Sequence, residues 1–271
     1  MDIPLFPLHT VLCPGIVLPL HIFEDRYRAL TRHCLDTGDP FGVVLIRDGR
    51  EVGSEGVLAL AGVGAFVEIR QAGRYPDGRY DLLAAATGRF AIESVDTDRA
   101  PYLVADVRPL EDEVGDEDRA ERLSAAAVRR FVRYLELLRA RDGETAEVLD
   151  IRVELDAAPD EDLEPSSAAV MEEVRGETGT AGEEEDDADE ADDAPRTHDL
   201  VIPDDPTVLS HLLSGIVQAE LPRRQALLEA DTTEERLEGL VELLDREILL
   251  LERRLRFFTP DPRLASGVRR S

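Results

Sequence analysis

The stretch VGAFVEIRQAGRYPDGRYDLLA, residues 63–84, shows what kind of fold this chain forms. Apolar residues occupy every second position on both sides of an Asp77-Gly78 pair, namely Val63, Ala65, Val67 and Ile69 before it and Tyr80, Leu82 and Ala84 after it. A period of two is typical of a strand with two unlike faces. Because Asp-Gly favours the tight turn between two antiparallel strands, these residues predict a β-hairpin.

The same kind of pattern extends from Asp2 to about Leu110, where short apolar runs are separated by Gly, Pro and Asp. They predict further strands at 41–46, 90–95 and 102–107. Several short strands at this spacing favour a barrel or a sandwich over a parallel sheet. One helix is expected within this region, over residues 24–35 and ended by Gly38, because four apolar residues recur at helical spacing: Phe23, Tyr27, Leu30 and Cys34.

Helical patterns dominate the second half of the chain. After Asp118 one apolar stripe is formed by Leu123, Ala127, Phe131, Tyr134, Leu135 and Leu138. Asp205-Pro206 reads as an N-cap followed by Pro at the first helical position. Thr232 and Glu235 then form a capping box before a long apolar stripe, made of Leu237, Leu240, Val241, Leu244, Ile248, Leu251 and Leu255. Leu243, Leu249 and Leu250 lie off that stripe, and internal packing is favoured for them over contact with a partner.

Negative charge is concentrated in one segment. The net charge is −28, and roughly −16 of it lies between Glu154 and Arg196. Such a segment has too few large apolar residues to offset the entropy of ordering, so we expect it to be solvated and disordered. The predicted division is a β-domain over 1–115, a helical segment over 116–153, the acidic insertion over 154–203 and a helical subdomain over 204–260. A polyanion repels phosphate backbones, so nucleic-acid binding is not expected.

The chain contains 31 basic residues, and all of them are Arg. Without Lys there is neither a P-loop Lys for nucleotide phosphates nor a Ser-Lys peptidase dyad. Codon usage that favours Arg also explains why the sequence contains no Lys. The first residues of the sequence show neither the basic nor the apolar region typical of a signal peptide, and the sequence contains no apolar run of the ~20 residues that span a bilayer. We therefore expect a cytoplasmic protein that needs no membrane, carries no cofactor and is not an enzyme.

Ordered blocks at both ends of the chain resemble the N-terminal domain of the Lon family of ATP-dependent proteases. The first blocks are Ile3-Pro4-Leu5-Phe6-Pro7-Leu8, Val11-Leu12-Cys13-Pro14-Gly15 and Leu18-Pro19-Leu20-His21-Ile22-Phe23-Glu24-Asp25-Arg26-Tyr27. Later blocks are Phe41-Gly42-Val43-Val44-Leu45-Ile46, Gly88-Arg89-Phe90, Arg224-Gln225-Ala226-Leu227-Leu228-Glu229 and Leu243-Leu244-Asp245-Arg246-Glu247. The resemblance covers about residues 2–110 and 205–255 and leaves the acidic insertion unmatched.

The resemblance implies an α+β fold, with a PUA-like β-barrel or sandwich that carries one inserted helix and is followed by a helical subdomain. In full-length Lon proteases this module collects unfolded or tagged substrates. It therefore implies a free-standing, non-catalytic polypeptide-recognition module, with a separate ATP-dependent protease as a candidate partner. The candidate contacts with a bound polypeptide are Phe6, His21, Phe23, Arg26 and Tyr27. Core packing is the competing and favoured interpretation for Phe23 and Tyr27.

Two other functions remain open. An RNA-binding role follows from the PUA-like resemblance, and Arg26, Arg28 and Arg32 on the exposed side of the inserted helix are residues that can meet phosphate. A hydrolase with an unrecognised nucleophile is the other alternative. Five His and Cys residues lie within the first 34 positions and are candidates for a nucleophile or a metal site, namely His9, Cys13, His21, His33 and Cys34. Their spacing matches neither a C-x-x-C pair nor an H-x-x-x-H helix face, so no metal is expected.

Overall fold

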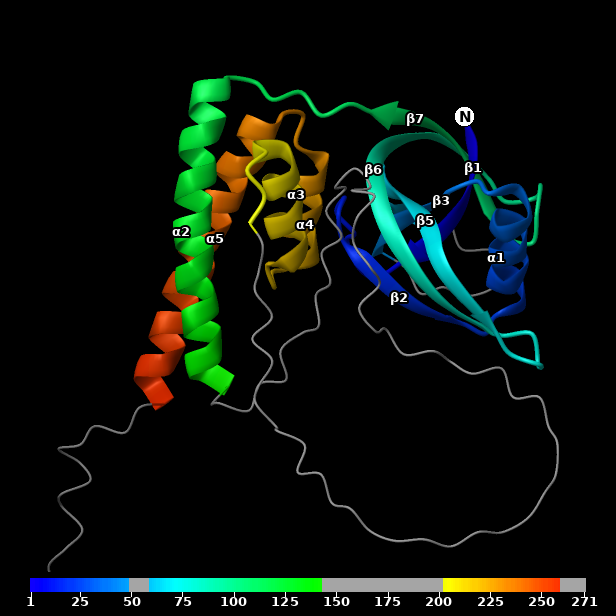
Figure 1. The fold of residues 1–271 in the computed structure, drawn as a ribbon, viewed down its shortest axis with the longest axis horizontal. Coiled ribbons are helices and arrows are strands. Elements are labelled where there is room, and N and C mark those ends of the chain that lie inside the picture. The colour runs from blue at the N-terminus through cyan, green and yellow to red at the C-terminus, as the bar shows by residue number, and fades with distance from the viewer. Residues whose placement is uncertain (49–58, 143–201, 259–271) are drawn as a thin grey trace, which may run out of the picture. The chain divides into compact units, whose positions relative to one another are not determined.

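The computed structural model describes residues 1–48, 59–142 and 202–258, which form seven strands and five helices (Figure 1). The N-terminal elements are β1 (Asp2–Leu8), β2 (Val17–Ile22), α1 (Asp25–Thr37), β3 (Phe41–Asp48), β4 (Ala59–Leu60), β5 (Val63–Arg74), β6 (Tyr80–Asp96) and β7 (Leu103–Leu110). The later helices are α2 (Glu117–Asp142), α3 (Pro206–Ile216), α4 (Leu221–Glu229) and α5 (Thr233–Phe258). The predicted acidic insertion lies outside the described residues, except for Ile202 and Pro203.

The strands close into a barrel. Their order is β1-β7-β6-β5-β3, and a parallel pairing of β1 with β3 joins the two ends. The predicted hairpin is confirmed, because β5 and β6 pair antiparallel on either side of Asp77-Gly78, and Gly78 has a φ of +86° that favours glycine. One expectation was wrong: residues 90–95 are not a separate strand but continue β6, which bends through register shifts to pair with β2 and β5 and then with β7.

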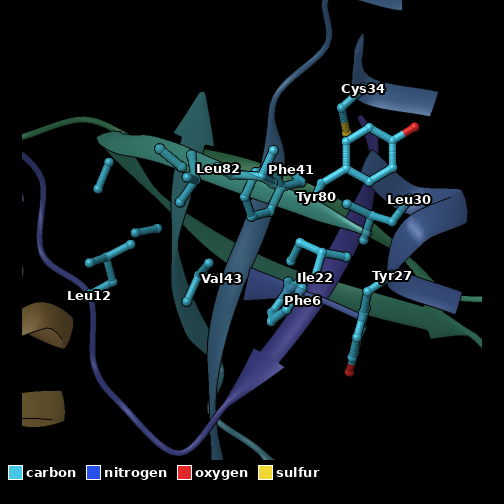
Figure 2. Close-up of a cluster of buried hydrophobic side chains, with 14 residues drawn as sticks. Phe6, Leu12, Ile22, Tyr27, Leu30, Cys34, Phe41, Val43, Tyr80 and Leu82 are labelled. Atoms are coloured by element: carbon cyan, nitrogen blue, oxygen red, sulfur yellow. The ribbon is translucent and has the colours of Figure 1, made fainter. Parts of the chain in front are cut away.

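The barrel core lies between the strands and α1 (Figure 2). Tyr27, Leu30 and Cys34 are buried on α1, as their spacing predicted. The Tyr27 ring stacks on Phe6 of β1, with the ring centroids 4.1 Å apart. Phe23 departs from the expected stripe: it is 61% exposed, because α1 begins at Asp25 and Phe23 lies before its first turn.

The helices form their own apolar core, in which α2 and α5 run side by side (Figure 1). The predicted stripes are confirmed as far as Leu251, and Leu255 lies beyond the side chains that the structure describes. The buried side chains include Ala127, Phe131, Tyr134, Leu237, Leu240, Leu244 and Leu251. The N-cap at Asp205 is also confirmed, since its carboxylate accepts the Thr207 and Val208 amide hydrogens. Leu243 is buried, in agreement with the internal packing favoured for it, but Leu249 and Leu250 are exposed, contrary to that expectation.

The capping box of α5 is present in altered form. The Glu235 amide donates to Thr232 Oγ1 at 3.1 Å, as predicted. The Glu235 carboxylate accepts from the Asp231 amide at 3.2 Å, one residue before the Thr232 amide that the motif specifies. The cap therefore satisfies two amide hydrogens at the start of α5, but over a wider turn.

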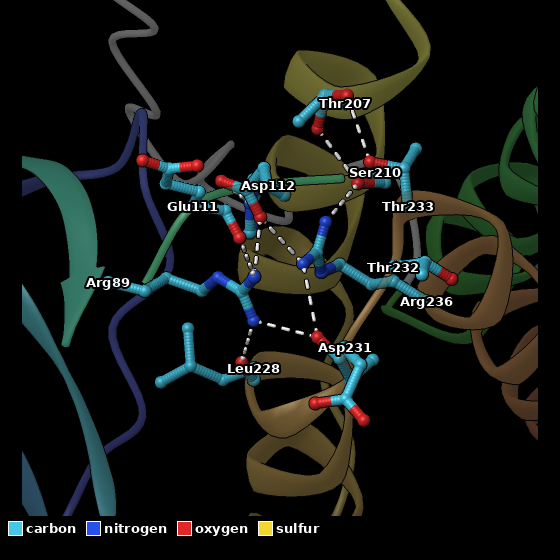
Figure 3. A network of polar contacts seen from close by, with 12 residues as sticks. Arg89, Glu111, Asp112, Thr207, Ser210, Leu228, Asp231, Thr232, Thr233 and Arg236 are labelled. Carbon is cyan, nitrogen blue, oxygen red and sulfur yellow. Dashed lines mark hydrogen bonds and ion pairs between the residues drawn. The ribbon is translucent and has the colours of Figure 1, made fainter. Parts of the chain in front are cut away.

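A buried polar network joins the barrel to the helices (Figure 3). Asp112, which follows β7, accepts from Arg89 of β6 at 2.7 Å and from Arg236 of α5 at 2.9 Å. The two guanidinium groups also donate to backbone carbonyls at the end of α4, those of Leu227, Leu228 and Ala230. Since α4 has no basic residue in its own last turn, these arginines supply the cations that a helix C-terminus favours.

His211 of α3 completes this network. Its Nε2 lies 3.1 Å from both oxygens of Asp112, and its Nδ1 is buried and has no hydrogen-bond partner among the residues that the structure describes. Burial lowers the pKa of His211, and the positive charges of Arg236 and Arg89 act in the same direction against the opposing effect of Asp112. For Asp112, burial opposes ionisation, but the His211 hydrogen bond and the two arginines outweigh it and hold the pKa far below its ordinary value.

The lowered pKa of His211 predicts a pH-dependent stability. The unfolded chain takes up a proton at this histidine near its ordinary pKa of 6.5, and the folded chain does so only at lower pH. The contribution of His211 to the free energy of unfolding should therefore be complete above pH 6.5. As the pH drops under 6.5, the free energy of unfolding should decrease by at most about 1.4 kcal/mol per pH unit. Urea unfolding of the wild-type protein and of His211→Gln between pH 7 and 5 measures this slope. The substituted protein should lack it.

A control separates this effect from the general response of an acidic protein to pH. His33→Gln changes an exposed histidine on α1, and this protein should show the wild-type slope. If His211→Gln shows that slope as well, His211 is not the group responsible.

Candidate functional site

Exposed rings gather beside the β5–β6 hairpin. We call His21, Phe23, Tyr75, Arg79 and Asp81 the aromatic patch. β2 pairs antiparallel with the start of β6, and this register sets His21 directly opposite Asp81. Phe23 follows β2, and Tyr75 and Arg79 are the ends of the hairpin turn, where the Tyr75 amide donates to the Arg79 carbonyl at 2.9 Å. Two segments that are far apart in the sequence, residues 21–23 and 75–81, thus contribute to one surface.

The three rings of the aromatic patch lie close to one another. The centroid of His21 is 6.2 Å from that of Phe23, with an interplanar angle of 27°, and 6.2 Å from that of Tyr75, with an angle of 70°. The Arg79 guanidinium lies 5.4 Å from the centroid of Tyr75. Phe23 and Tyr75 are 61% and 41% exposed, so both present apolar ring surface to solvent.

Polar contacts hold the rings in place. His21 Nδ1 lies 2.6 Å from Asp81 Oδ1, and the Tyr75 hydroxyl donates to Asp81 Oδ2. These two hydrogen bonds, that of Tyr75 first, lower the pKa of Asp81, and the same contact raises the pKa of the Tyr75 hydroxyl. With Asp81 ionised, both side chains donate to it. The His21 and Tyr75 rings are therefore positioned before any partner binds, which reduces the entropy lost on binding.

The strand beside the aromatic patch has an unpaired edge in the described part of the chain. There β2 pairs with β6 and with no other strand. An edge strand offers backbone N–H and C=O groups to an extended peptide. Pro19 lies within β2 and lacks an N–H, as is usual for a strand at an edge. The patch can thus receive a peptide through ring contacts and through part of a strand edge.

The structure separates the five residues predicted to contact a polypeptide. His21 and Phe23 lie in the aromatic patch. Arg26 is half-buried, with its guanidinium 2.8 Å from Glu24 and 4.5 Å from the centroid of the Tyr27 ring. Phe6 and Tyr27 are only 7% and 6% exposed and pack in the barrel core, because they stack on each other behind the surface.

Sequence reasoning missed Tyr75, Arg79 and Asp81 as members of this surface. They were assigned only to the hairpin and its turn. Nothing in the local pattern indicates that β2, some 60 residues earlier, pairs with the start of β6. Two aromatic residues near a predicted turn, Tyr75 and Tyr80, are the only signal that was present, and Tyr80 is buried.

The two cysteines that were considered as nucleophiles lie in the core. Burial raises the pKa of the Cys13 thiol to about 11 and that of Cys34 to about 12. Both values favour the thiol over the reactive thiolate. Across residues 1–48, 59–142 and 202–258, no three His, Cys, Asp or Glu side chains are placed to hold a metal ion. None of the helices described there combines the length and apolar character needed to cross a membrane.

Comparison of sequences places the chain beside one protease family. A sequence model of the family described as ATP-dependent protease La (LON) substrate-binding domain matches residues 2–246. The chain is 26% identical over 257 residues to a Lon protease of Azorhizobium caulinodans, covering 93% of this chain and 24% of that protein. It is 28% identical over 123 residues to a Lon protease of Flavobacterium johnsoniae, covering 45% and 15%. The chain thus spans about a quarter or less of the length of these curated relatives.

Two solved structures share the fold. One is the crystal structure of a Lon N-terminal domain protein from Xanthomonas campestris, with a TM-score of 0.52 and 23% identity over 89% of this chain and 98% of that one. The other is the N-terminal domain of a Mycobacterium avium complex Lon protease, with a TM-score of 0.54 and 15% identity over 90% and 98%. At these identities the likeness concerns the fold, and it confirms the α+β architecture with a helical part after the barrel.

Proposed function

This chain belongs to the LON substrate-binding domain family, and from that premise we propose that it binds exposed segments of unfolded or tagged polypeptides at its aromatic patch. In this proposal it makes and breaks no covalent bond. Binding energy comes from apolar surface removed from water, with little preference for a particular sequence. The family name concerns substrate binding, and the relatives' printed name, Lon protease, suggests that the bound chains are destined for proteolysis.

The observation that carries this proposal is the exposure of Phe23 and Tyr75 next to an unpaired strand edge. Large apolar rings are normally buried, so a cluster of them on a surface indicates a contact site. Aromatic residues and Arg dominate the energetics of protein interfaces, and the patch offers both kinds through Phe23, Tyr75 and Arg79. An extended chain can lie across the rings while its backbone pairs with the edge of β2.

The proposed role is that of an adaptor or regulator that delivers clients to a separate ATP-dependent protease in the cytoplasm. The absence of Lys supports a chain without its own nucleotide or Ser-Lys chemistry. The net charge of −28 favours polypeptide over nucleic acid as the partner, because a phosphate backbone would be repelled.

Binding to a permanently unfolded protein tests this function. Fluorescently labelled, reduced and carboxymethylated α-lactalbumin should bind the wild-type chain in a fluorescence anisotropy titration. The double substitution Phe23→Ser/Tyr75→Ser should weaken this binding at least about tenfold, since ring contacts at the centre of an interface are each worth roughly 1–2 kcal/mol or more. Thermal unfolding of the variant should match the wild type, because both rings are exposed.

The matched control is Leu35→Ser, which removes an equally exposed apolar side chain from α1 outside the patch. It should bind like the wild type. No binding by the wild-type chain would refute the proposed function. Equal weakening by Leu35→Ser would show that general surface hydrophobicity, and not the aromatic patch, captures clients.

A further inference from the structure

A β-bulge at the start of β2 determines which backbone groups of this strand point to its open edge. Gly15, just before β2, has a φ of +82°, and its amide donates to the Ala86 carbonyl of β6 at 2.9 Å. The Ala86 amide donates in turn to the Ile16 carbonyl at 3.0 Å. This is the pattern of a bulge whose first residue is a glycine in the left-handed region. The Ile16 carbonyl therefore faces β6.

Backbone groups along an antiparallel strand face one neighbour and then the other, residue by residue. In the register of β2 with β6, the residues that face β6 are Ile16, Leu18, Leu20 and Ile22. The residues between them point their backbone groups to the open edge, namely Val17, Pro19 and His21. Pro19 agrees with this assignment independently, because a proline has no N–H to give to the ladder and is found where a strand is unpaired.

The open edge of β2 has more acceptors than donors. It presents the carbonyls of Val17, Pro19 and His21, but only two N–H groups, because Pro19 has none. Within the described part of the chain, neither a second strand nor a loop backbone bonds to these groups. Pro19 and His21 are exposed, so the edge is accessible at its centre and at the end next to Phe23. An extended polypeptide, with its own alternating N–H and C=O groups, is the ligand that matches such an edge.

We propose that a client segment adds to the barrel as a further strand, paired with Val17 and His21 on the edge of β2, and that Pro19 limits the strength of this pairing and excludes a second copy of the chain. The inference rests on the proposed function and names the conformation of the bound client. The client accepts from the Val17 and His21 amides and donates to the three outward carbonyls. Opposite Pro19, the client carbonyl receives no donor. Because every residue except proline offers the same backbone groups, this pairing needs no particular client sequence.

Pro19 treats a client and a second copy differently. Two β2 strands that pair antiparallel about a twofold axis centred on the open edge set Val17 opposite His21 and Pro19 opposite Pro19 of the second copy. Both hydrogen bonds at the centre are then lost, because neither proline has an N–H. A client loses only one of them, since its own N–H still donates to the Pro19 carbonyl. The proline therefore disfavours edge-to-edge association more than it disfavours client binding.

Pro19→Ala supplies the missing N–H without adding apolar surface. Its affinity for unfolded α-lactalbumin should rise about two- to tenfold, the effect of one added hydrogen bond, and it should self-associate at a lower concentration than the wild type in sedimentation. Pro109→Ala is the matched control, because Pro109 is an exposed proline within β7, outside β2 and the aromatic patch. It should bind and sediment like the wild type. Unchanged or weaker binding by Pro19→Ala, unchanged sedimentation of it, or an equal gain from Pro109→Ala would overturn the role given to Pro19.

Amide hydrogen exchange tests the pairing residue by residue. In the full-length ¹⁵N-labelled chain the Val17 and His21 amides should exchange rapidly, and saturating unfolded α-lactalbumin should slow both by at least about tenfold. The Leu18 amide, which faces β6, should exchange slowly with and without client.

The outcomes separate this inference from the function on which it rests. If the unfolded protein binds and the Val17 and His21 amides are not slowed, the β2 edge is not used and the proposed function stands. Slow exchange of both amides in the client-free chain that becomes faster on dilution would show that a second copy occupies the edge, and would also overturn the inference. If the unfolded protein does not bind at all, the proposed function itself fails.

Discussion

Asp112→Ala is expected to lower the free energy of unfolding by about 3–5 kcal/mol, the range seen when one partner of a buried ion pair is removed. Asp112 Oδ1 lies 2.7 Å from Arg89 and 2.9 Å from Arg236, and these arginines are only 2% and 0% exposed. Burial already lowers the pKa of Arg236 to about 10. Without the carboxylate, two like charges would remain side by side in a poorly solvated place. Guanidinium chloride unfolding followed by circular dichroism measures the loss.

The matched control is Asp245→Ala. Asp245 accepts a hydrogen bond from Arg130 at 2.7 Å, nearly the same distance as in the buried pair, but its side chain is 55% exposed. An exposed pair of this kind contributes about 0–1 kcal/mol, because water screens the charges and solvates each partner alone. A loss on Asp112→Ala no larger than that on Asp245→Ala would show that the network around Asp112 does not stabilise the fold.

The network around Asp112 also fixes the position of α4. Arg89 reaches from the barrel to the carbonyls of Leu228 and Ala230 at the end of this helix. Arg236 reaches the Leu227 carbonyl from α5. The Arg89 contacts hold α4 against the barrel, and the Arg236 contact holds α4 against α5.

Local patterns in the sequence predicted most elements of this fold. The β5–β6 hairpin followed from alternation around Asp77-Gly78, and α3 and α5 followed from their caps and apolar spacing. These features are local, because each depends on residues within a few positions of one another. The continuity of β6 through residues 90–95 was missed, and the strand runs unbroken through Gly88 from Tyr80 to Asp96.

Contacts between distant segments could not be predicted in the same way. Asp112 lies in the acidic run Glu111-Asp112-Glu113, which resembles a solvated turn, yet it pairs with Arg236 more than 120 residues later. Arg89 was noted only as part of a short block. In the candidate site, His21 and Phe23 were predicted, but Tyr75 and Asp81 join them only through the pairing of β2 with β6. Phe6 and Tyr27 were also predicted to contact a polypeptide, with core packing favoured for Tyr27, and both side chains stack on each other in the barrel core.

The packing of α2 on α5 leads to the second large prediction, that Phe131→Ala lowers the free energy of unfolding by about 3–5 kcal/mol. Phe131 is 1% exposed in the helical core, with its ring centroid 6.1 Å from that of Tyr134. Truncation to Ala leaves a cavity that long helices cannot close without shifting along their whole contact. Because α2 and α5 are far apart in the sequence, this core, rather than local helix preference, holds them together.

Val132→Ala provides the control on the next residue of the same helix. Val132 is 47% exposed, so its truncation removes little buried surface, and Ala is the better helix former. Its effect should stay within about 0.5 kcal/mol of the wild type in the same denaturant titration. If Phe131→Ala were no more harmful than Val132→Ala, then α2 would not pack on α5 through this ring, and the helical core would have to be held by the exposed ion pairs between the two helices, such as Arg130 with Asp245.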